Sequence, residues 1–501
     1  MDINRDINRL LHFARQQHLI DRRDSIYAAN RLIYVLRASE FISEAVDETL
    51  PSALPVLDSL LGFAVERGIV ADSYEERELF KTRLMDCVMP RPSEVEARFW
   101  ADYAVSPRLA TDNFYRFCKA TNYINQEKDS RKAEWKVSSP YGELEISINV
   151  SKPDRELEEI TELRTRRRNV YPRCPLCIEN EGFAGTASSP ARRTLRLISL
   201  ELDGRRWYWQ YSPYLYFNEH SVLLSAEHNA GSLSRDTFRL LLAFLDKFPH
   251  YFIGAGADLP VLGGALQAHE HYITGCCHFP IEGAPFEKSY CFAGFESITA
   301  GRLRWPVPVI RLQGTDARRL TVLADKIRRT WYSWDDETVG LRSSTDGVPH
   351  HTLTIAARKR GDIYELDIAL RSNLRTKERP QGLFFQRPQL RHIKKEPFGI
   401  AEVQGREILP PRLMTTMQEV REELLRGSSE IEDIRSIAKH DRWYKYLRAE
   451  YPDISDDNVN DIMREEIGRV FLKALGDIAV FKSDEAGQAA FDRFAAALGT
   501  V

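Results

Sequence analysis

The stretch Asp258-Leu-Pro-Val-Leu-Gly-Gly-Ala-Leu-Gln-Ala-His269-Glu-His271-Tyr272 decides how the rest of the sequence is interpreted. Alternate side chains of an extended segment share a face, so the spacing predicts that His269 and His271 point the same way at a strand end. The glycines at 263 and 264 allow the backbone to pass close to a bulky group such as phosphate. Two imidazoles facing one space indicate a metal ligand, a nucleophile, or one of each. The alternative is a strand end with two exposed histidines.

The composition is that of a globular protein with two or more domains. The chain has 501 residues, of which 43% are hydrophobic and 29% charged. A net charge of -3 gives no strong field toward nucleic acid or membrane, and no apolar run reaches membrane-spanning length. The N-terminal residues lack the pattern of a signal peptide, and seven cysteines, including one C-x-x-C pair, fit a reducing compartment. We therefore expect a cytoplasmic protein.

Residues 1–130 have the periodicity of helices. One apolar stripe includes Ile3, Ile7 and Leu10 at helical spacing. Ser73 with Glu76, and Ser93 with Glu96, have the spacing of capping boxes and predict helix starts. No acid–base constellation is present, so this region is interpreted as a scaffold or lid.

Residues 131–300 and 301–412 alternate as strands do, and residues 413–501 return to helical spacing. The turn Asp203-Gly204 predicts a hairpin, and Ser234 predicts the start of a helix before the two histidines. A second hairpin is expected around Gly361, and Ser455 is expected to cap a C-terminal helix. The prediction is an α+β fold: two mixed α/β halves with antiparallel sheets, flanked by helical N- and C-terminal regions.

The pair Cys174-Pro-Leu-Cys177 has a spacing that lets two thiolates bind one zinc ion. Alone it is equally a redox pair or a turn without a ligand. Two further ligands of the right type, His228 and His269, follow in the same section and complete a Cys2His2 set. The spacing matches no zinc finger, so the fold has to assemble this structural zinc site.

If His269 is held by metal, His271 projects beside it into the same cleft. A neutral imidazole nitrogen can attack phosphorus and form a covalent phosphoramidate. A backbone carbonyl or carboxylate on the other ring nitrogen would fix the tautomer. With backbone amides of Gly263 and Gly264 facing the phosphate oxygens, the pattern predicts nucleotidyl transfer through a covalent histidine intermediate.

Nearly the whole chain resembles the type 2 galactose-1-phosphate uridylyltransferases, of the histidine-triad-like superfamily. Besides the two-histidine stretch, the blocks that carry the resemblance include Tyr171-Pro-Arg-Cys-Pro-Leu-Cys-Ile-Glu-Asn-Glu-Gly-Phe-Ala-Gly185, Phe217-Asn-Glu-His220, Phe248-Pro-His-Tyr-Phe-Ile-Gly254, Trp305-Pro-Val-Pro-Val-Ile-Arg311 and His392-Ile-Lys-Lys-Glu396. Several blocks in order are more specific than any single motif.

The resemblance implies that His271 accepts UMP from UDP-glucose and that galactose 1-phosphate then discharges it, in a ping-pong cycle of galactose metabolism. It implies zinc at Cys174, Cys177, His228 and His269, and a core of two histidine-triad-like halves. The residues we assign to substrate binding are Asn218, Gly263, Gly264, Gln267 and Ile273. The substrates are small molecules, with no nucleic acid or membrane partner, and the oligomeric state is left open, a homodimer included.

The chain reads His269-Glu-His-Tyr-Ile-Thr-Gly275 where the family pattern is H-D-H-F-Q-G-G, and its departures include Glu270, Tyr272 and Ile273. The last replaces a glutamine that donates hydrogen bonds to phosphate oxygens, and loss of such a donor costs about 100- to 1,000-fold in rate. Candidate replacements for the lost donor are Arg192, Arg311 and Lys394.

A second metal site of related enzymes has only His350, His351 and His392 as remnants here, and we expect ordinary structural roles for them. The alternatives to a transferase are a nucleotide-sugar hydrolase, which loss of the glutamine favours, and a non-catalytic sugar-nucleotide binding protein.

Overall fold

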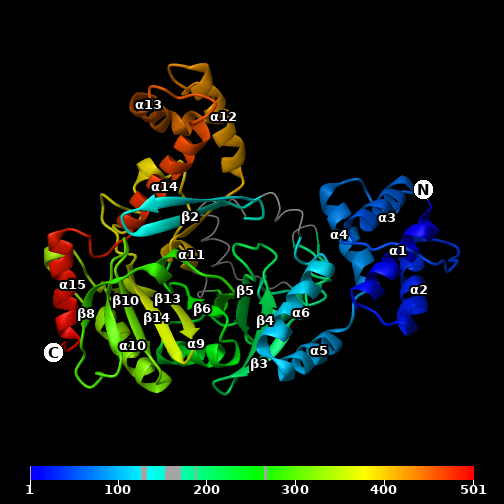
Figure 1. Cartoon of the computed structure of the whole chain (residues 1–501), viewed down its shortest axis with the longest axis horizontal. Helices are drawn as coiled ribbons and strands as arrows, with labels where there is room; N and C mark the ends of the chain where they lie inside the picture. The colour runs from blue at the N-terminus through cyan, green and yellow to red at the C-terminus, as the bar shows by residue number, and fades with distance from the viewer. Residues whose placement is uncertain (1, 126–131, 153–170, 187–188, 264–267, 501) are drawn as a thin grey trace. The chain divides into compact units, whose positions relative to one another are not determined.

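The computed structural model describes residues 2–125, 132–152, 171–186, 189–263 and 268–500 (Figure 1). Its helices and sheets form an α+β protein with helical N- and C-terminal regions, as predicted. Two compact units are present: residues 1–127, 168–215 and 221–228 form the first, and 128–167, 216–220 and 229–501 the second. No helix in the described ranges is both long and apolar enough to cross a membrane. The four-part division at residues 130, 300 and 412 stays a prediction.

The first unit begins with six helices. They are α1 (Ile3–Gln16), α2 (Ser25–Leu36), α3 (Leu54–Glu66), α4 (Tyr74–Asp86), α5 (Pro92–Val105) and α6 (Pro107–Ala120). Ser73 caps α4 by accepting from the Glu76 amide, as predicted. The cap predicted at Ser93 is wrong, because α5 starts at Pro92, a residue whose missing N–H suits the first helical turn.

Three antiparallel strands complete the first unit: β3 (Ile198–Leu202), β4 (Arg205–Tyr211) and β5 (Ser221–Ser225). The predicted hairpin turn is confirmed, since Asp203 and Gly204 both take positive φ between β3 and β4. Trp209 on β4 packs against Phe99 and Phe114 of the two adjacent helices, which buries the hairpin on one side.

The second unit contains a small sheet of β1 (Ala133–Ser139), β2 (Gly142–Ile148) and β15 (Arg406–Leu409). The pair β1–β2 is antiparallel, but β15 pairs with β2 in parallel. The prediction of antiparallel sheets is therefore wrong at this pairing. The two strands are more than 250 residues apart in the sequence, so no local pattern marks their pairing.

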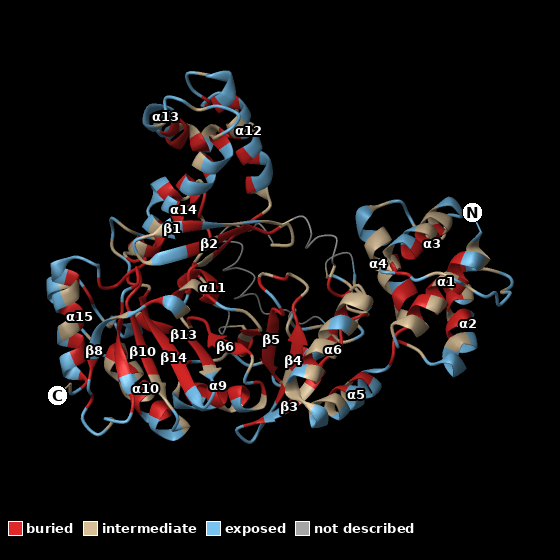
Figure 2. Ribbon diagram, in the orientation of Figure 1, coloured by how far each residue is buried: buried red, intermediate tan, exposed pale blue. Residues whose placement is uncertain are grey.

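The main sheet of the second unit has the strand order β7-β6-β13-β14-β10-β9-β8, and every pairing in it is antiparallel. The strands are β6 (Phe252–Ala255), β7 (His271–Gly275), β8 (Phe286–Tyr290), β9 (Thr299–Leu303), β10 (Val309–Gly314), β13 (His351–Arg360) and β14 (Ile363–Ser372). The hairpin predicted around Gly361 is confirmed as β13–β14. Figure 2 shows these central strands buried along most of their length.

The two faces of this sheet differ in chemistry. Helices α9 (Arg235–Lys247) and α10 (Ala317–Tyr332) pack on the face that carries the apolar side chains (Figure 1). Ser234 caps α9, as predicted. The other face carries Arg311, Arg358 and Asp367, all buried.

The remaining helices of the second unit are α11 (Ile400–Val403), α12 (Arg412–Arg426), α13 (Asp441–Glu450), α14 (Val459–Asp477) and α15 (Glu485–Ala497). Short elements between them and elsewhere are η1 (Arg22–Asp24), η2 (Ile178–Asn180), η3 (Pro280–Gly283), η4 (Glu337–Val339), η5 (Pro388–Leu390), η6 (Ala438–His440), β11 (Ser344–Thr345) and β12 (Val348–Pro349). The cap predicted at Ser455 is wrong, because α14 begins only after Asn458.

Candidate metal centre and active site

His271 is the first residue of β7, and a nearby backbone carbonyl group orients its ring. The Nδ1 atom lies 2.7 Å from the carbonyl oxygen of His269. A carbonyl oxygen only accepts, so Nδ1 carries the proton and the neutral ring has its lone pair on Nε2. The side chain is buried, with 8% of its area exposed. This is the orientation that the sequence predicted for a nucleophilic imidazole.

His269 lies before the strand, in a bend, and is also buried. The prediction that both histidines belong to one strand is therefore wrong. The apolar run before them forms turns rather than a strand over residues 259–263, because Pro260 and the glycines interrupt it.

The residues that depart from the family pattern have packing roles. The hydroxyl of Tyr272 donates to Glu270 at 2.9 Å, so these two changes form one hydrogen-bonded pair. Ile273 pairs with Gly254 of β6 and packs against the hydrophobic core of the second unit. An aliphatic side chain donates no hydrogen bond, so Ile273 cannot donate to a phosphate oxygen as a glutamine at this position could.

Two of the proposed replacements for that donor are engaged elsewhere. Arg311 holds both carboxylate oxygens of Asp367, at 2.6 and 2.9 Å. Lys394 donates to Glu407 at 2.9 Å and is fully buried. Both side chains therefore serve buried ion pairs, while the role suggested for Arg192 stays a prediction.

The other candidate binding residues are only partly described. Asn218 is exposed and its side-chain amide donates to the Cys276 carbonyl at 2.9 Å. A Cβ at Gly263 would lie 2.1 Å from the carbonyl oxygen of Phe398, so a close approach of two backbone segments requires this glycine. Gly264 and Gln267 lie outside the described residues.

Cys174 and Cys177 face each other in a loop that a buried amide stabilises. The Sγ atoms are 3.4 Å apart. The side chain of Asn180 donates to the carbonyls of both cysteines, at 2.7 and 2.8 Å. Hydrogen bonding from the Cys177 thiol lowers the pKa of the Cys174 thiol, which favours the thiolate that binds metal. Sequence reasoning missed Asn180, whose only signal is its place three residues after the second cysteine.

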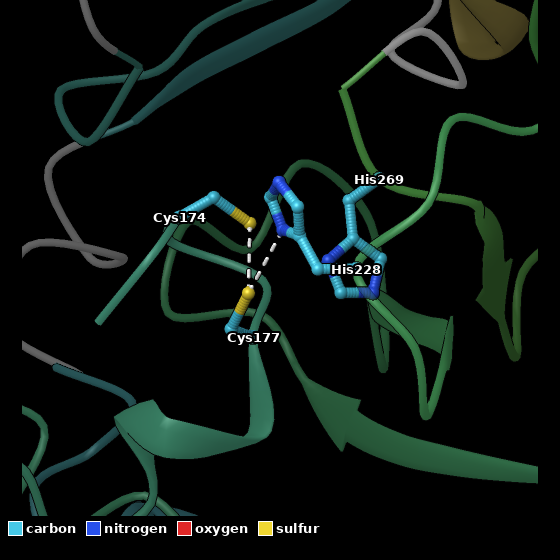
Figure 3. Close-up of side chains that lie close together, drawn as sticks. All are labelled: Cys174, Cys177, His228 and His269. Atoms are coloured by element: carbon cyan, nitrogen blue, oxygen red, sulfur yellow. Dashed lines mark hydrogen bonds between the residues drawn. The ribbon is translucent and has the colours of Figure 1, made fainter. Parts of the chain in front are cut away.

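His228, in the segment after β5, completes the donor set, with Nδ1 3.0 Å from the Sγ of Cys177. Figure 3 draws these three side chains together with His269, and one ligand atom from each of the four lies within 4.8 Å of the others. Two sulfur and two nitrogen donors are a set that zinc binds, and thiolates on a tetrahedral zinc are about 3.8 Å apart. The residues present therefore fit a metal ion.

The three remaining histidines of the sequence analysis have structural partners. His351 stacks on Trp331 with ring centres 4.1 Å apart, and its Nε2 lies 3.0 Å from the Trp334 carbonyl. His392 lies with its Nδ1 2.9 Å from that of His440. His350 contacts a side-chain oxygen at each ring nitrogen. These contacts agree with the structural roles expected for them.

Comparisons with known proteins agree with this arrangement. The family model of the galactose-1-phosphate uridyl transferase N-terminal domain matches residues 18–230, and that of the C-terminal domain matches residues 244–444. The galactose-1-phosphate uridylyltransferase of Clostridium acetobutylicum is 41% identical over 492 residues, which cover 98% of this chain and 99% of that protein. The chain belongs to the galactose-1-phosphate uridyl transferase family.

Other relatives give the same result. The galactose-1-phosphate uridylyltransferase of Streptococcus pneumoniae strain Hungary19A-6 is 40% identical over 477 residues, 95% of each chain. That of Halalkalibacterium halodurans is 39% identical over 497 residues, 98% of each chain. Among solved structures, yeast Ap4A phosphorylase Apa2 aligns with 66% of this chain and 91% of that chain at 10% identity and a TM-score of 0.33, which is too low to support any argument.

Proposed function

We propose that this protein transfers UMP from UDP-glucose to galactose 1-phosphate through a covalent uridylyl-histidine at His271. The observation that carries the proposal is the hydrogen bond between Nδ1 of His271 and the carbonyl of His269. It leaves the lone pair on Nε2, the atom that would attack phosphorus. Membership of the family supports the choice of substrates.

In the first half-reaction, Nε2 of His271 attacks the α-phosphorus of UDP-glucose. The nitrogen–phosphorus bond forms, the bond from that phosphorus to the bridging oxygen breaks, and glucose 1-phosphate leaves. In the second, a phosphate oxygen of galactose 1-phosphate attacks the same phosphorus. The nitrogen–phosphorus bond breaks, UDP-galactose leaves, and the imidazole returns to its starting state.

We assign zinc to Cys174, Cys177, His228 and His269. Zinc, when bound, would hold these four side chains in fixed positions. Fixing His269 matters most for the reaction, because its carbonyl oxygen orients the ring of His271. The pair of cysteines is oriented in turn by the amide of Asn180.

Substrate contacts are assigned to Asn218, Gly263, Gly264, Gln267 and Ile273. Because Ile273 lacks the donor of the family glutamine, water could compete with galactose 1-phosphate for the intermediate, as in a nucleotide-sugar hydrolase. We expect transfer to dominate, and we expect a cytoplasmic enzyme without nucleic acid or membrane partners, a homodimer being compatible with the sequence.

Steady-state kinetics test the proposal. UDP-galactose formation is measured with UDP-glucose varied at several fixed concentrations of galactose 1-phosphate. Parallel double-reciprocal lines are expected, because the first product leaves before the second substrate binds. Intersecting lines would contradict a covalent intermediate, and release of UMP at a rate independent of galactose 1-phosphate would identify the hydrolase.

A further inference from the structure

Arg371, the penultimate residue of β14, is a buried cation with little compensation. Its exposed fraction is 1%. Among the described residues its guanidinium donates one hydrogen bond, from Nη1 to the hydroxyl of Thr354 at 3.2 Å. A guanidinium has five N–H donors and normally forms two parallel bonds to a carboxylate or phosphate. Burial lowers the pKa of Arg371 to about 10, a sign of a poorly stabilised charge.

Neighbouring arginines on the same sheet are paired with carboxylates. Arg311 and Arg358 both hold the carboxylate of Asp367, the former from β10 and the latter from β13. The charge that acts on Arg371 is that of Glu402, but no ion pair within 4 Å joins them in the described part of the chain. Glu402 lies 3.6 Å from Lys394 and from Lys152. Arg371 is thus the arginine of this sheet that lacks a carboxylate partner in the described ranges.

Strand register places Arg371 on the same face as His271. Ile273, Gly254, Ala356 and Asp367 are consecutive cross-strand partners from β7 to β14. Side chains two or four residues apart on a strand share a face. His271 is two residues from Ile273, Thr354 is two residues from Ala356, and Arg371 is four residues from Asp367, so all three lie on the same face of the sheet.

The side chains between the two residues on this face are short. In the row of His271, the strand register places Gly256, just past the end of β6, and Thr354 of β13. Two strand spacings separate β7 from β13, which is about 10 Å. The guanidinium of Arg371 is bonded to Thr354 on β13, so it lies on the near side of its own strand. It is too far to hold the phosphorus bonded to His271, but suitably placed for the next phosphate of a diphosphate chain.

We propose that Arg371 binds the phosphate group of the sugar 1-phosphate, as the leaving group in the first half-reaction and as the attacking group in the second. This rests on the function proposed above. A phosphate supplies the two parallel acceptors that the guanidinium lacks, and in a closed, dry site such a charge-assisted pair is strong. The same contact offsets the negative charge that develops on the departing phosphate.

The test compares Arg371→Gln and Arg371→Lys with Arg311→Gln, a matched change of a buried arginine that is already paired. For Arg371→Gln we expect the KM for galactose 1-phosphate to rise about 10- to 100-fold, with a smaller rise for Arg371→Lys, which keeps the charge but loses the bidentate geometry. The thermal midpoint of ligand-free Arg371→Gln should stay unchanged or rise, because an unpaired buried charge is removed. Arg311→Gln should lower the midpoint and leave this KM within about twofold.

Calorimetric titration of galactose 1-phosphate into each protein separates this inference from the proposed function. Binding by wild type that is lost in Arg371→Gln supports the inference even if no UMP is transferred. An unchanged KM and unchanged titration in Arg371→Gln would overturn it while transfer stands. A lowered midpoint with unchanged binding would also overturn it, since Arg371 would then be a structural residue.

Discussion

The carbonyl oxygen of His269 accepts a hydrogen bond from Nδ1 of His271 at 2.7 Å. One residue of the candidate metal site therefore orients, through its backbone, the residue assigned as nucleophile. Any change that moves the backbone at His269 should turn the ring of His271 as well. The metal site and the chemistry are linked by this one bond.

Replacing His271 with Ala removes the atom that attacks phosphorus. We expect incorporation of labelled UMP to disappear and transfer to fall about 1,000-fold or more, as for other nucleophiles that act covalently. The measurement is the label that stays on the protein in a denaturing gel after exposure to UDP-glucose, with the sample kept at neutral or alkaline pH because acid hydrolyses the nitrogen–phosphorus bond.

The matched control is His278→Ala, because His278 is an exposed histidine of the same unit, 2.9 Å from Glu282. It should keep wild-type labelling. Label that persists in His271→Ala would sink the assignment of the nucleophile.

Asn180→Ala tests the metal centre without removing a ligand. Its amide holds the carbonyls of Cys174 and Cys177 in place. Loss of such a supporting contact is expected to weaken zinc affinity by about 10- to 100-fold. Competition with a chromogenic chelator measures the affinity, and Cys291→Ser, at an exposed cysteine, is the control. Equal zinc affinity in Asn180→Ala and wild type would contradict the assignment.

The sequence predicted the elements of the site better than their setting. The spacing of Cys174, Cys177, His228 and His269 sufficed to propose a donor set, and the structure brings their ligand atoms within 4.8 Å. A backbone carbonyl or a carboxylate on the imidazole of His271 was also expected, but the sequence did not indicate that the accepting carbonyl belongs to His269. The prediction that His269 and His271 lie on one strand was wrong, because β7 begins at His271 and the alternation of side chains does not extend back to His269.

Pairings between segments far apart in the chain could not be predicted from the sequence. The parallel pairing of β15 with β2 and the ion pairs of Asp367 join segments whose local patterns carry no trace of the partner. The burial of Arg371 could not be predicted either, because the sequence alone suggests that an arginine at a strand end is solvated. The cap predictions were correct at Ser73 and Ser234, where the serine side chain itself does the capping, and wrong at Ser93 and Ser455.

Asp367→Asn should destabilise the second unit strongly. Burial opposes the ionisation of Asp367, but the charges of Arg358 and Arg311 outweigh it and lower the pKa of the carboxyl group. Removing the shared anion leaves two buried guanidinium groups without it, which costs about 3–5 kcal/mol. Denaturant unfolding measures the change. Asp461→Asn, which breaks an exposed pair with Arg464, should have little effect. A similar small effect for both would contradict the structural role of Asp367.

Acid should destabilise the protein through its buried neutral histidines. Burial lowers the pKa of His351 to about 4, against about 6.5 in the unfolded chain. Between these two values the unfolded state binds a proton that the folded state does not. Stability therefore falls as pH is lowered through this window, by about 1.4 kcal/mol per pH unit for each such group.

His351→Gln removes this titration and offers a side-chain N–H toward the Trp334 carbonyl. Between pH 6.5 and pH 4, the slope of the unfolding free energy against pH should decrease by up to about 1.4 kcal/mol per pH unit, the contribution of one histidine. An unchanged slope would mean that His351 does not stay neutral in the folded protein.

The central claim is that His271 becomes covalently uridylylated, and intact mass spectrometry tests it most directly. The purified protein is exposed to UDP-glucose alone and then to galactose 1-phosphate. We expect a mass increase of one UMP, located on His271 by peptide mapping, that disappears on addition of galactose 1-phosphate as UDP-galactose forms. Transfer of UMP to galactose 1-phosphate by a protein that never gains this mass would contradict the account.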